Sequence, residues 1–129
     1  MSQQLQRILC VEDEPDIQAV ARMALEMVGG FEVRVCSSGD EALRELQAWQ
    51  PDLVLLDVMM PGMDGPSTLK ALRALPGLER LPVAFMTAKV QSGEVAQYKA
   101  LGALDVIAKP FDPMKLSDQV RAIWGKDRG

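Results

Sequence analysis

The segment LVLLDVMMPGMDG, residues 53–65, decides the fold of this 129-residue chain. Four apolar residues lead to one carboxylate, Asp57, and a run of turn-forming residues follows at once. Such an apolar run is typical of a strand that is covered on both faces of a parallel sheet. Asp57 is then expected where the strand emerges, and a carboxylate there is costly unless something pairs with it. This makes Asp57 a candidate functional group.

Similar runs and helical segments fill the rest of the chain. Apolar runs recur at residues 7–11, 83–86 and 106–108. Residues 31–36 alternate between apolar and polar, which indicates a strand with one wet face at a sheet edge. Segments with helical spacing of apolar residues lie between the strands. Five strands therefore alternate with five helices, which predicts an α/β fold with a doubly wound parallel sheet and helices on both faces.

Three helix boundaries are specific enough to test. Residues 38–41 have the spacing of a capping box, and the helix that they begin is expected to run through Trp49 until Pro51 stops it. Asp112 and Pro113 are expected to form the cap and first turn of the last helix. Residues 91–101 have few large apolar side chains, so this fourth helix is expected to be the least firmly docked.

Composition limits the functions that the chain can have. Its length suits one domain, residues 1–129 with a core over about 6–125, and 48% of its residues are apolar. A net charge of −4 argues against a DNA-binding face. The sequence has no apolar run near the roughly 20 residues that cross a membrane and no apolar signal core, so we expect a cytoplasmic protein. The absence of histidine excludes a phosphohistidine in this chain. Cys10 and Cys36 are expected to be buried free thiols.

Polar residues stand where four of the five strands end. Glu12 and Asp13 follow the first strand, Asp57 the third, Thr87 the fourth and Lys109 the fifth. In doubly wound sheets, ligands bind at the carboxyl ends of the strands, near the point where the strand order reverses. We therefore expect these residues to converge at one edge of the sheet.

The three acids of this group indicate a metal site. Their charges repel one another unless their pKa values rise or a cation binds between them. Carboxylates, a carbonyl and waters are the ligands that Mg²⁺ prefers. We predict Asp13 and Asp57 as direct ligands, with the carbonyl of Met59 as a third and Glu12 acting through a metal-bound water.

Each residue type suits one part of a phosphoryl transfer. An ionised Asp57 can attack phosphorus and form an acyl phosphate, while Mg²⁺ offsets the charge of the transferring oxygens. Lys109 supplies a compact positive charge, and the Thr87 hydroxyl can donate a hydrogen bond to a phosphoryl oxygen. Read separately, Asp13 and Thr87 could be simple helix caps, and Lys109 a solvated lysine.

The chain resembles the receiver domain of two-component response regulators, the CheY-like fold, over nearly its whole length. The matching motifs are Glu12-Asp13, LLDVMMPGMDG around Asp57, Thr87-Ala88 and Lys109-Pro110-Phe111. The resemblance implies a three-layer sandwich with strand order 2-1-3-4-5. It also implies Mg²⁺-dependent transfer to Asp57 from a phosphohistidine on a partner histidine kinase or phosphotransfer protein. The resemblance further implies that Ala88 helps Thr87 and Lys109 to bind the phosphoryl group. It also implies a cis peptide bond before Pro110.

By the same resemblance, the protein is a signalling switch and not an enzyme, since it catalyses only its own phosphorylation and dephosphorylation. Its output is expected through the face formed by the fourth helix, the fifth strand and the fifth helix. This face is expected to bind another protein, since no output segment follows residue 129 if the chain is complete. The family often has an aromatic residue where this chain has Val106. Met59 and Lys89 stand at positions that tune the kinetics, and an apolar Met59 cannot orient a hydrolytic water, which predicts slow loss of phosphate.

Three other functions fit the sequence less well. A phosphatase of the haloacid dehalogenase type needs a second acid two residues after the nucleophile, where this chain has Met59. A flavin-binding protein needs a loop that cradles phosphate after the first strand, where this chain has four acids within residues 12–16. A degenerate receiver that binds partners without phosphorylation is the main alternative.

Overall fold

The computed structural model describes residues 4–128 and contains one sheet of five parallel strands in the order β2-β1-β3-β4-β5. The strands are β1 (Arg7–Val11), β2 (Glu32–Cys36), β3 (Leu53–Asp57), β4 (Val83–Thr87) and β5 (Asp105–Ala108). The helices are α1 (Pro15–Met23), a π-helical turn η1 (Ala24–Val28), α2 (Gly39–Glu45), α3 (Gly65–Arg73), α4 (Ser92–Ala100) and α5 (Leu116–Arg128). This architecture confirms the predicted fold class.

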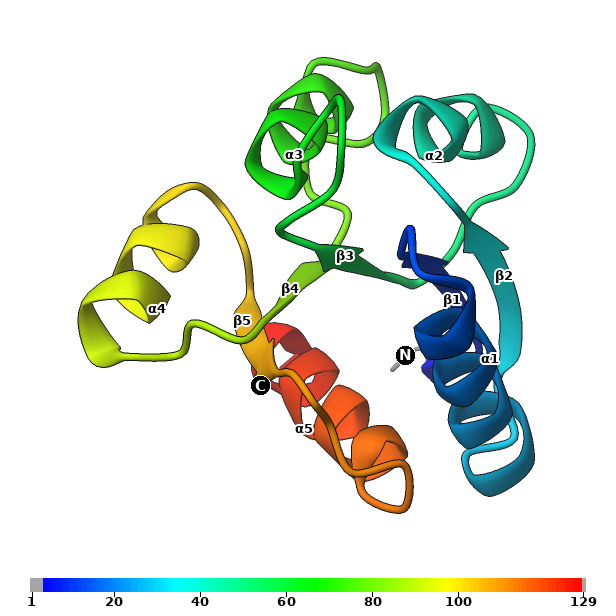
Figure 1. Ribbon diagram of the computed structural model, residues 1–129. Coiled ribbons are helices and arrows are strands. Elements are labelled where there is room, and N and C mark those ends of the chain that lie inside the picture. The colour runs from blue at the N-terminus through cyan, green and yellow to red at the C-terminus, as the bar shows by residue number, and fades with distance from the viewer. Residues whose placement is uncertain (1–3, 129) are drawn as a thin grey trace.

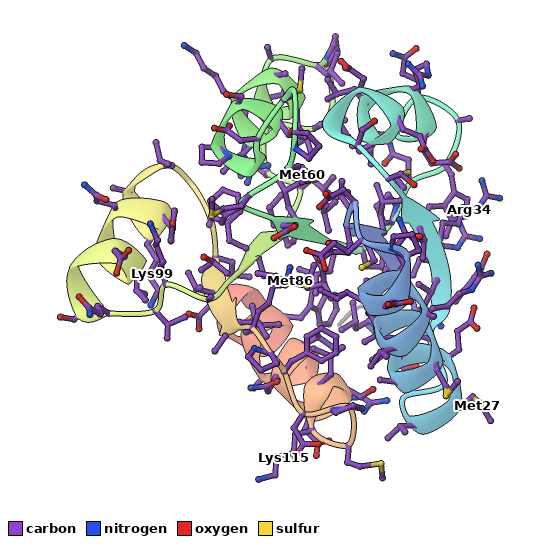
Figure 2. All side chains as sticks on the ribbon, in the orientation of Figure 1. Met27, Arg34, Met60, Met86, Lys99 and Lys115 are labelled. Carbon is purple, nitrogen blue, oxygen red and sulfur yellow. The ribbon has the colours of Figure 1, made fainter. Side chains whose placement is uncertain are left out.

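The sheet separates two apolar cores. Helices α1 and α5 cover one face and α2 and α3 cover the other, while α4 lies at the β5 end (Figure 1). Because side chains alternate across a strand, Leu55 contributes to the core beneath α1 and α5, and Leu56 to the core beneath α2 and α3. Met86 is fully buried in the first of these cores, whereas Met27 projects from η1 with 78% of its surface exposed (Figure 2).

Burial along the strands follows their place in the sheet. All five residues of β3 and all five of β4 are buried, as their continuous apolar runs predict. The edge strand β2 exposes Glu32 and Arg34 and buries Val33, as its alternation predicts. The register pairs Asp57 with Met86 and Thr87 with Ala108, so the strands end at nearly one level. The polar residues that follow them are thereby placed on one edge of the sheet.

Two helix boundaries differ from the sequence prediction. Helix α2 ends at Glu45, and Trp49 lies beyond it, where the Arg34 guanidinium covers its ring at 4.8 Å. Helix α5 begins at Leu116 because Asp112 instead caps a separate turn, accepting a hydrogen bond from Met114 N at 2.9 Å. The Asp112 cap is a local side-chain to backbone hydrogen bond, whereas the Arg34–Trp49 contact joins strand β2 to the turn after α2. The predicted cap by Ser38 is confirmed, since Ser38 Oγ accepts from Glu41 N at 3.1 Å, but the Glu41 side chain accepts from Ser37 N and not from Ser38 N, so the box is not closed.

Helix α1 continues into a π turn that the sequence pattern does not reveal. The buried Ser117 Oγ of α5 donates to the Ala24 carbonyl at 3.1 Å, and Arg121 Nη2 donates to the Gly29 carbonyl at 2.6 Å. Gly29 also packs too closely for a side chain, because an added Cβ would lie 2.3 Å from Ser117 Oγ. Helix α5 thus fixes the end of α1 through contacts made far away in sequence.

Helix α4 is loosely packed, as its composition predicts. None of its nine residues, all within the described part of the chain, is buried. Its Tyr98 ring meets Phe85 of β4 edge-on, with 5.2 Å between the ring centroids. Among residues 4–128, no helix has the length and apolar character needed to cross a bilayer.

Candidate functional site

Three carboxylates meet where β1 and β3 end. Glu12, Asp13 and Asp57 each offer an oxygen, and these oxygens all lie within 4.8 Å of one another. Glu12 has no exposed surface and Asp57 is only 3% exposed. The strand order reverses between β1 and β3, so this is the switch point of the sheet. The predicted acidic cluster is therefore present, and Glu12 and Asp57 are buried in it.

Lys109 bridges two of the acids. Its Nζ donates to Glu12 Oε1 at 2.8 Å and to Asp57 Oδ1 at 3.2 Å. The peptide bond between Lys109 and Pro110 is cis, as the family resemblance implies. Burial alone lowers the pKa of Lys109, but the hydrogen bond to Glu12 and the charges of both acids raise it above its ordinary value. Lys109 is thus held as a cation at the site.

One lysine does not balance three acids. Burial, and after it the nearby Glu12 carboxylate, raise the pKa of Asp57 to about 6, although the Lys109 ammonium opposes both effects. The Asp57 carboxylate therefore carries an unfavourable charge at neutral pH. A second cation would relieve this charge.

An unpartnered oxygen fits such a cation. Asp13 Oδ1 is buried and accepts no hydrogen bond from any residue that the structure describes. A buried carboxylate oxygen left without a donor is costly, and a divalent ion would satisfy it. The donor set of hard oxygens suits Mg²⁺. Glu12, Asp13 and Asp57 lie close enough together to hold one ion. Direct ligation by Asp13 and Asp57, the Met59 carbonyl as a third ligand and the water-mediated role of Glu12 stay predictions.

A cavity of about 390 Å³ opens above Asp57. It is lined by Glu14, Ile17, Asp57, Met59, Thr87, Ala88, Lys89, Lys109 and Pro110. Thr87 is 3% exposed, and its Oγ1 accepts a hydrogen bond from Lys89 N at 3.1 Å, which leaves the hydroxyl proton free to be donated. The cavity is thus lined by every predicted site residue except three. Glu12 and Asp13 join Asp57 in the acidic cluster instead, and Val106 lies in strand β5.

Strand β5 carries Val106 at the position where the family often has an aromatic residue. Val106 is paired in register with Phe85 and packs only partly against the core beneath α2 and α3. The Phe85 ring is contacted instead by Tyr98 of α4. Sequence reasoning did not find this contact, because it joins a helix and a strand whose packing depends on the tertiary structure.

Gly65 is a second residue that the sequence analysis did not single out. A Cβ at this position would lie 2.5 Å from the Asp57 carbonyl and 2.8 Å from Val58 Cα. Gly65 N also donates to the Val58 carbonyl at 2.9 Å. The start of α3 therefore packs directly on the backbone that carries Asp57. The Asp64-Gly65 pair at the end of residues 53–65 was the available sequence signal for a close backbone approach.

Gly65→Ala is expected to lower the free energy of unfolding by about 2 kcal/mol, because the extra methyl must displace backbone and not a flexible side chain. Urea denaturation measures this loss. Gly93→Ala is the matched control, since nothing lies within 4 Å of its added Cβ and alanine favours the helix, so this variant should be slightly more stable. Equal stability of the two variants would contradict the close packing at Gly65.

Comparison with known proteins decides the family. The family model described as the response regulator receiver domain matches residues 8–121. The chain belongs to this family. Receiver domains of this family serve as phosphoacceptors in two-component systems and act as signalling switches.

Individual relatives agree with this assignment. The phosphate regulon transcriptional regulatory protein PhoB of Rhizobium meliloti is 40% identical over 119 residues, which is 92% of this chain and 52% of PhoB. The chemotaxis protein CheY4 of Vibrio cholerae superposes with a TM-score of 0.86 at 28% identity, over 93% of this chain and 99% of that one. The receiver domain of a sensor histidine kinase from Pseudomonas aeruginosa PAO1, solved with a magnesium ion in its active-site cleft, has a TM-score of 0.81 and 31% identity, covering 93% and 98%. The chain spans about half the length of the curated relatives it matches.

Proposed function

We propose that Asp57 accepts a phosphoryl group from a phosphohistidine on a partner histidine kinase or phosphotransfer protein, and that this transfer requires Mg²⁺. The observation that carries the proposal is the placement of Asp57, buried between the Lys109 ammonium and the acidic cluster that holds the unpartnered Asp13 oxygen. This placement supports the proposal, because a nucleophile, a fixed cation and candidate metal ligands would then be positioned before any substrate binds, as phosphoryl transfer requires.

Each side chain has a defined part in the reaction. An Asp57 carboxylate oxygen forms a bond to phosphorus as the bond from phosphorus to the donor imidazole nitrogen breaks, and the electron pair of that bond stays on the imidazole. Lys109 and the Thr87 hydroxyl stabilise the charge on the transferred oxygens, and Ala88 adjoins them in the cavity wall. Asp13 and Asp57 would hold Mg²⁺, which would offset negative charge on the phosphoryl oxygens.

Intact mass spectrometry after incubation with acetyl phosphate and Mg²⁺ tests the proposal. We expect one phosphoryl adduct on the unsubstituted chain, none on Asp57→Asn, and none when a chelator removes Mg²⁺. A chain that remains unmodified under these conditions, and also with a phosphorylated kinase or phosphotransfer protein, would favour the alternative, a degenerate receiver that binds partners without phosphorylation.

Met59→Asn is expected to shorten the lifetime of the phosphorylated protein severalfold. Met59 lines the cavity above Asp57 with 69% of its surface exposed, and its thioether is a poor hydrogen-bonding group for a hydrolytic water. An asparagine amide can orient that water. Loss of the adduct over time, after removal of the donor, gives the rate. Met59→Leu serves as the apolar control and should keep the original lifetime, and a lifetime unchanged by Met59→Asn would contradict this role.

The output is proposed to be protein binding through the face of α4, β5 and α5. Helix α4 has no buried residue among its nine described positions, so a change at the neighbouring site can shift it at little cost. We assign no nucleic-acid or membrane contact to this chain, whose net charge is −4, and we place it in the cytoplasm. The DNA-binding response regulator MtrA of Mycolicibacterium smegmatis, 39% identical over 91% of this chain, is covered over only 50% of its own length.

A further inference from the structure

A glutamine of α1 connects two loops beside the acidic cluster. Gln18 Nε2 donates to the carbonyl oxygen of Glu12, and it also donates to Ser37 Oγ at 3.1 Å. The Glu12 carbonyl belongs to the peptide that joins Glu12 to Asp13. The Gln18 side chain therefore fixes the orientation of the peptide group between Glu12 and Asp13.

The two acids depend on that peptide to different degrees. The Glu12 carboxylate is fixed by its own partners, since Oε2 accepts from Glu14 N at 3.0 Å and Oε1 accepts from Lys109. Asp13 Oδ1 accepts no hydrogen bond from the described residues. The direction of the Asp13 carboxylate therefore depends on the backbone that carries it. Glu12 N is held by the Cys36 carbonyl at 2.9 Å, and Gln18 holds the carbonyl end.

The other anchor of Gln18, Ser37, lies in the turn that begins α2. Ser37 N donates to Glu41 Oε1 at 3.1 Å, and Glu41 N donates to Ser38 Oγ at the same distance. These bonds cap α2 and fix the turn that leads into it. Gln18 thus ties the loop after β1 to a turn whose geometry is set independently.

We infer that Gln18 is a positioning residue that orients Asp13 for metal binding, through the Glu12 carbonyl and the Ser37 hydroxyl. This inference rests on the proposed function, because it assigns the supporting side chain of the same metal site. Residues that orient metal ligands typically change metal affinity by tenfold or more when they are replaced. Methionine has a similar length and shape but no donor, so Gln18→Met removes the hydrogen bonds with little loss of packing.

Binding of Mn²⁺ alone, followed by the electron paramagnetic resonance signal of the free ion, tests the inference without any phosphoryl donor. Gln18→Met is expected to raise the dissociation constant about tenfold. Ser37→Ala should raise it less, and the double variant should match Gln18→Met alone, because the hydroxyl acts only through Gln18. Gln97→Met, on the exposed side of α4, is the matched control and should leave the affinity unchanged.

A second measurement separates positioning from general stability. With acetyl phosphate as donor, Gln18→Met should need more Mg²⁺ for half-maximal phosphorylation and reach the original rate at saturating Mg²⁺. Unchanged Mn²⁺ affinity in Gln18→Met, or a loss of rate that saturating Mg²⁺ does not restore, would overturn the role of Gln18. A failure of the unsubstituted chain to bind Mn²⁺ would contradict the proposed function itself.

Discussion

Asp57→Asn is expected to raise the free energy of unfolding by about 3 kcal/mol at neutral pH in the absence of divalent ions. Burial and the Glu12 carboxylate raise the pKa of Asp57 to about 6 in the folded chain, from an ordinary value of 3.8. The gap between these values is the free energy that the fold loses by keeping Asp57 ionised. Asparagine keeps the shape and an acceptor for Lys109 but carries no charge. Urea denaturation, followed through the buried Trp49 and Trp124, measures the difference.

The pH dependence of this difference has a defined sign. A raised folded pKa means that the folded state holds the proton more tightly than the unfolded state. The stability contributed by protonated Asp57 is therefore fully present below about pH 4 and is lost as the pH rises through about 6. The advantage of Asp57→Asn should be small near pH 4 and nearly complete above pH 7. Millimolar Mg²⁺ should stabilise the unsubstituted chain more than the variant, and an advantage independent of both pH and Mg²⁺ would contradict this account.

Lys109→Met is expected to lower the free energy of unfolding by about 3 kcal/mol at neutral pH, again without divalent ions. The Glu12 carboxylate has no exposed surface, and its Oε1 accepts a hydrogen bond from Lys109 Nζ at 2.8 Å. Removal of the lysine leaves a buried charge without its cation, which costs far more than loss of a surface ion pair. The same variant should be phosphorylated much more slowly by acetyl phosphate, because the fixed cation beside Asp57 is gone.

Two controls make the Lys109 prediction specific. Lys99→Met removes a lysine with 46% of its side chain exposed, 3.7 Å from Asp105, and should cost less than about 1 kcal/mol. Adding Glu12→Gln to Lys109→Met should recover much of the lost stability, since the unpaired carboxylate is then neutral. If the double variant is no more stable than Lys109→Met alone, the cost does not come from Glu12.

Much of the fold and of the site could be predicted from local pattern. The apolar run that ends at Asp57 identified a central strand, and the alternation around Val33 identified an edge strand. The acids after the first and third strands could be placed together because parallel strands end at the same edge of the sheet. The helix ends near Trp49 and Asp112 were predicted wrongly, because the chain after Glu45 tightens into bonds between residues three apart and Asp112 caps a separate turn.

The sequence by itself determined the order of strands and helices and the chemistry gathered at the strand ends, because the periodicity of apolar residues and the side chain at each strand end are local properties. Only the tertiary structure decided which acid Lys109 would bind most closely, that Gln18 would hold the Glu12 carbonyl, and that Tyr98 would contact Phe85. These contacts join residues brought together by strand register and by the packing of helices on the sheet. No short stretch of sequence contains that information.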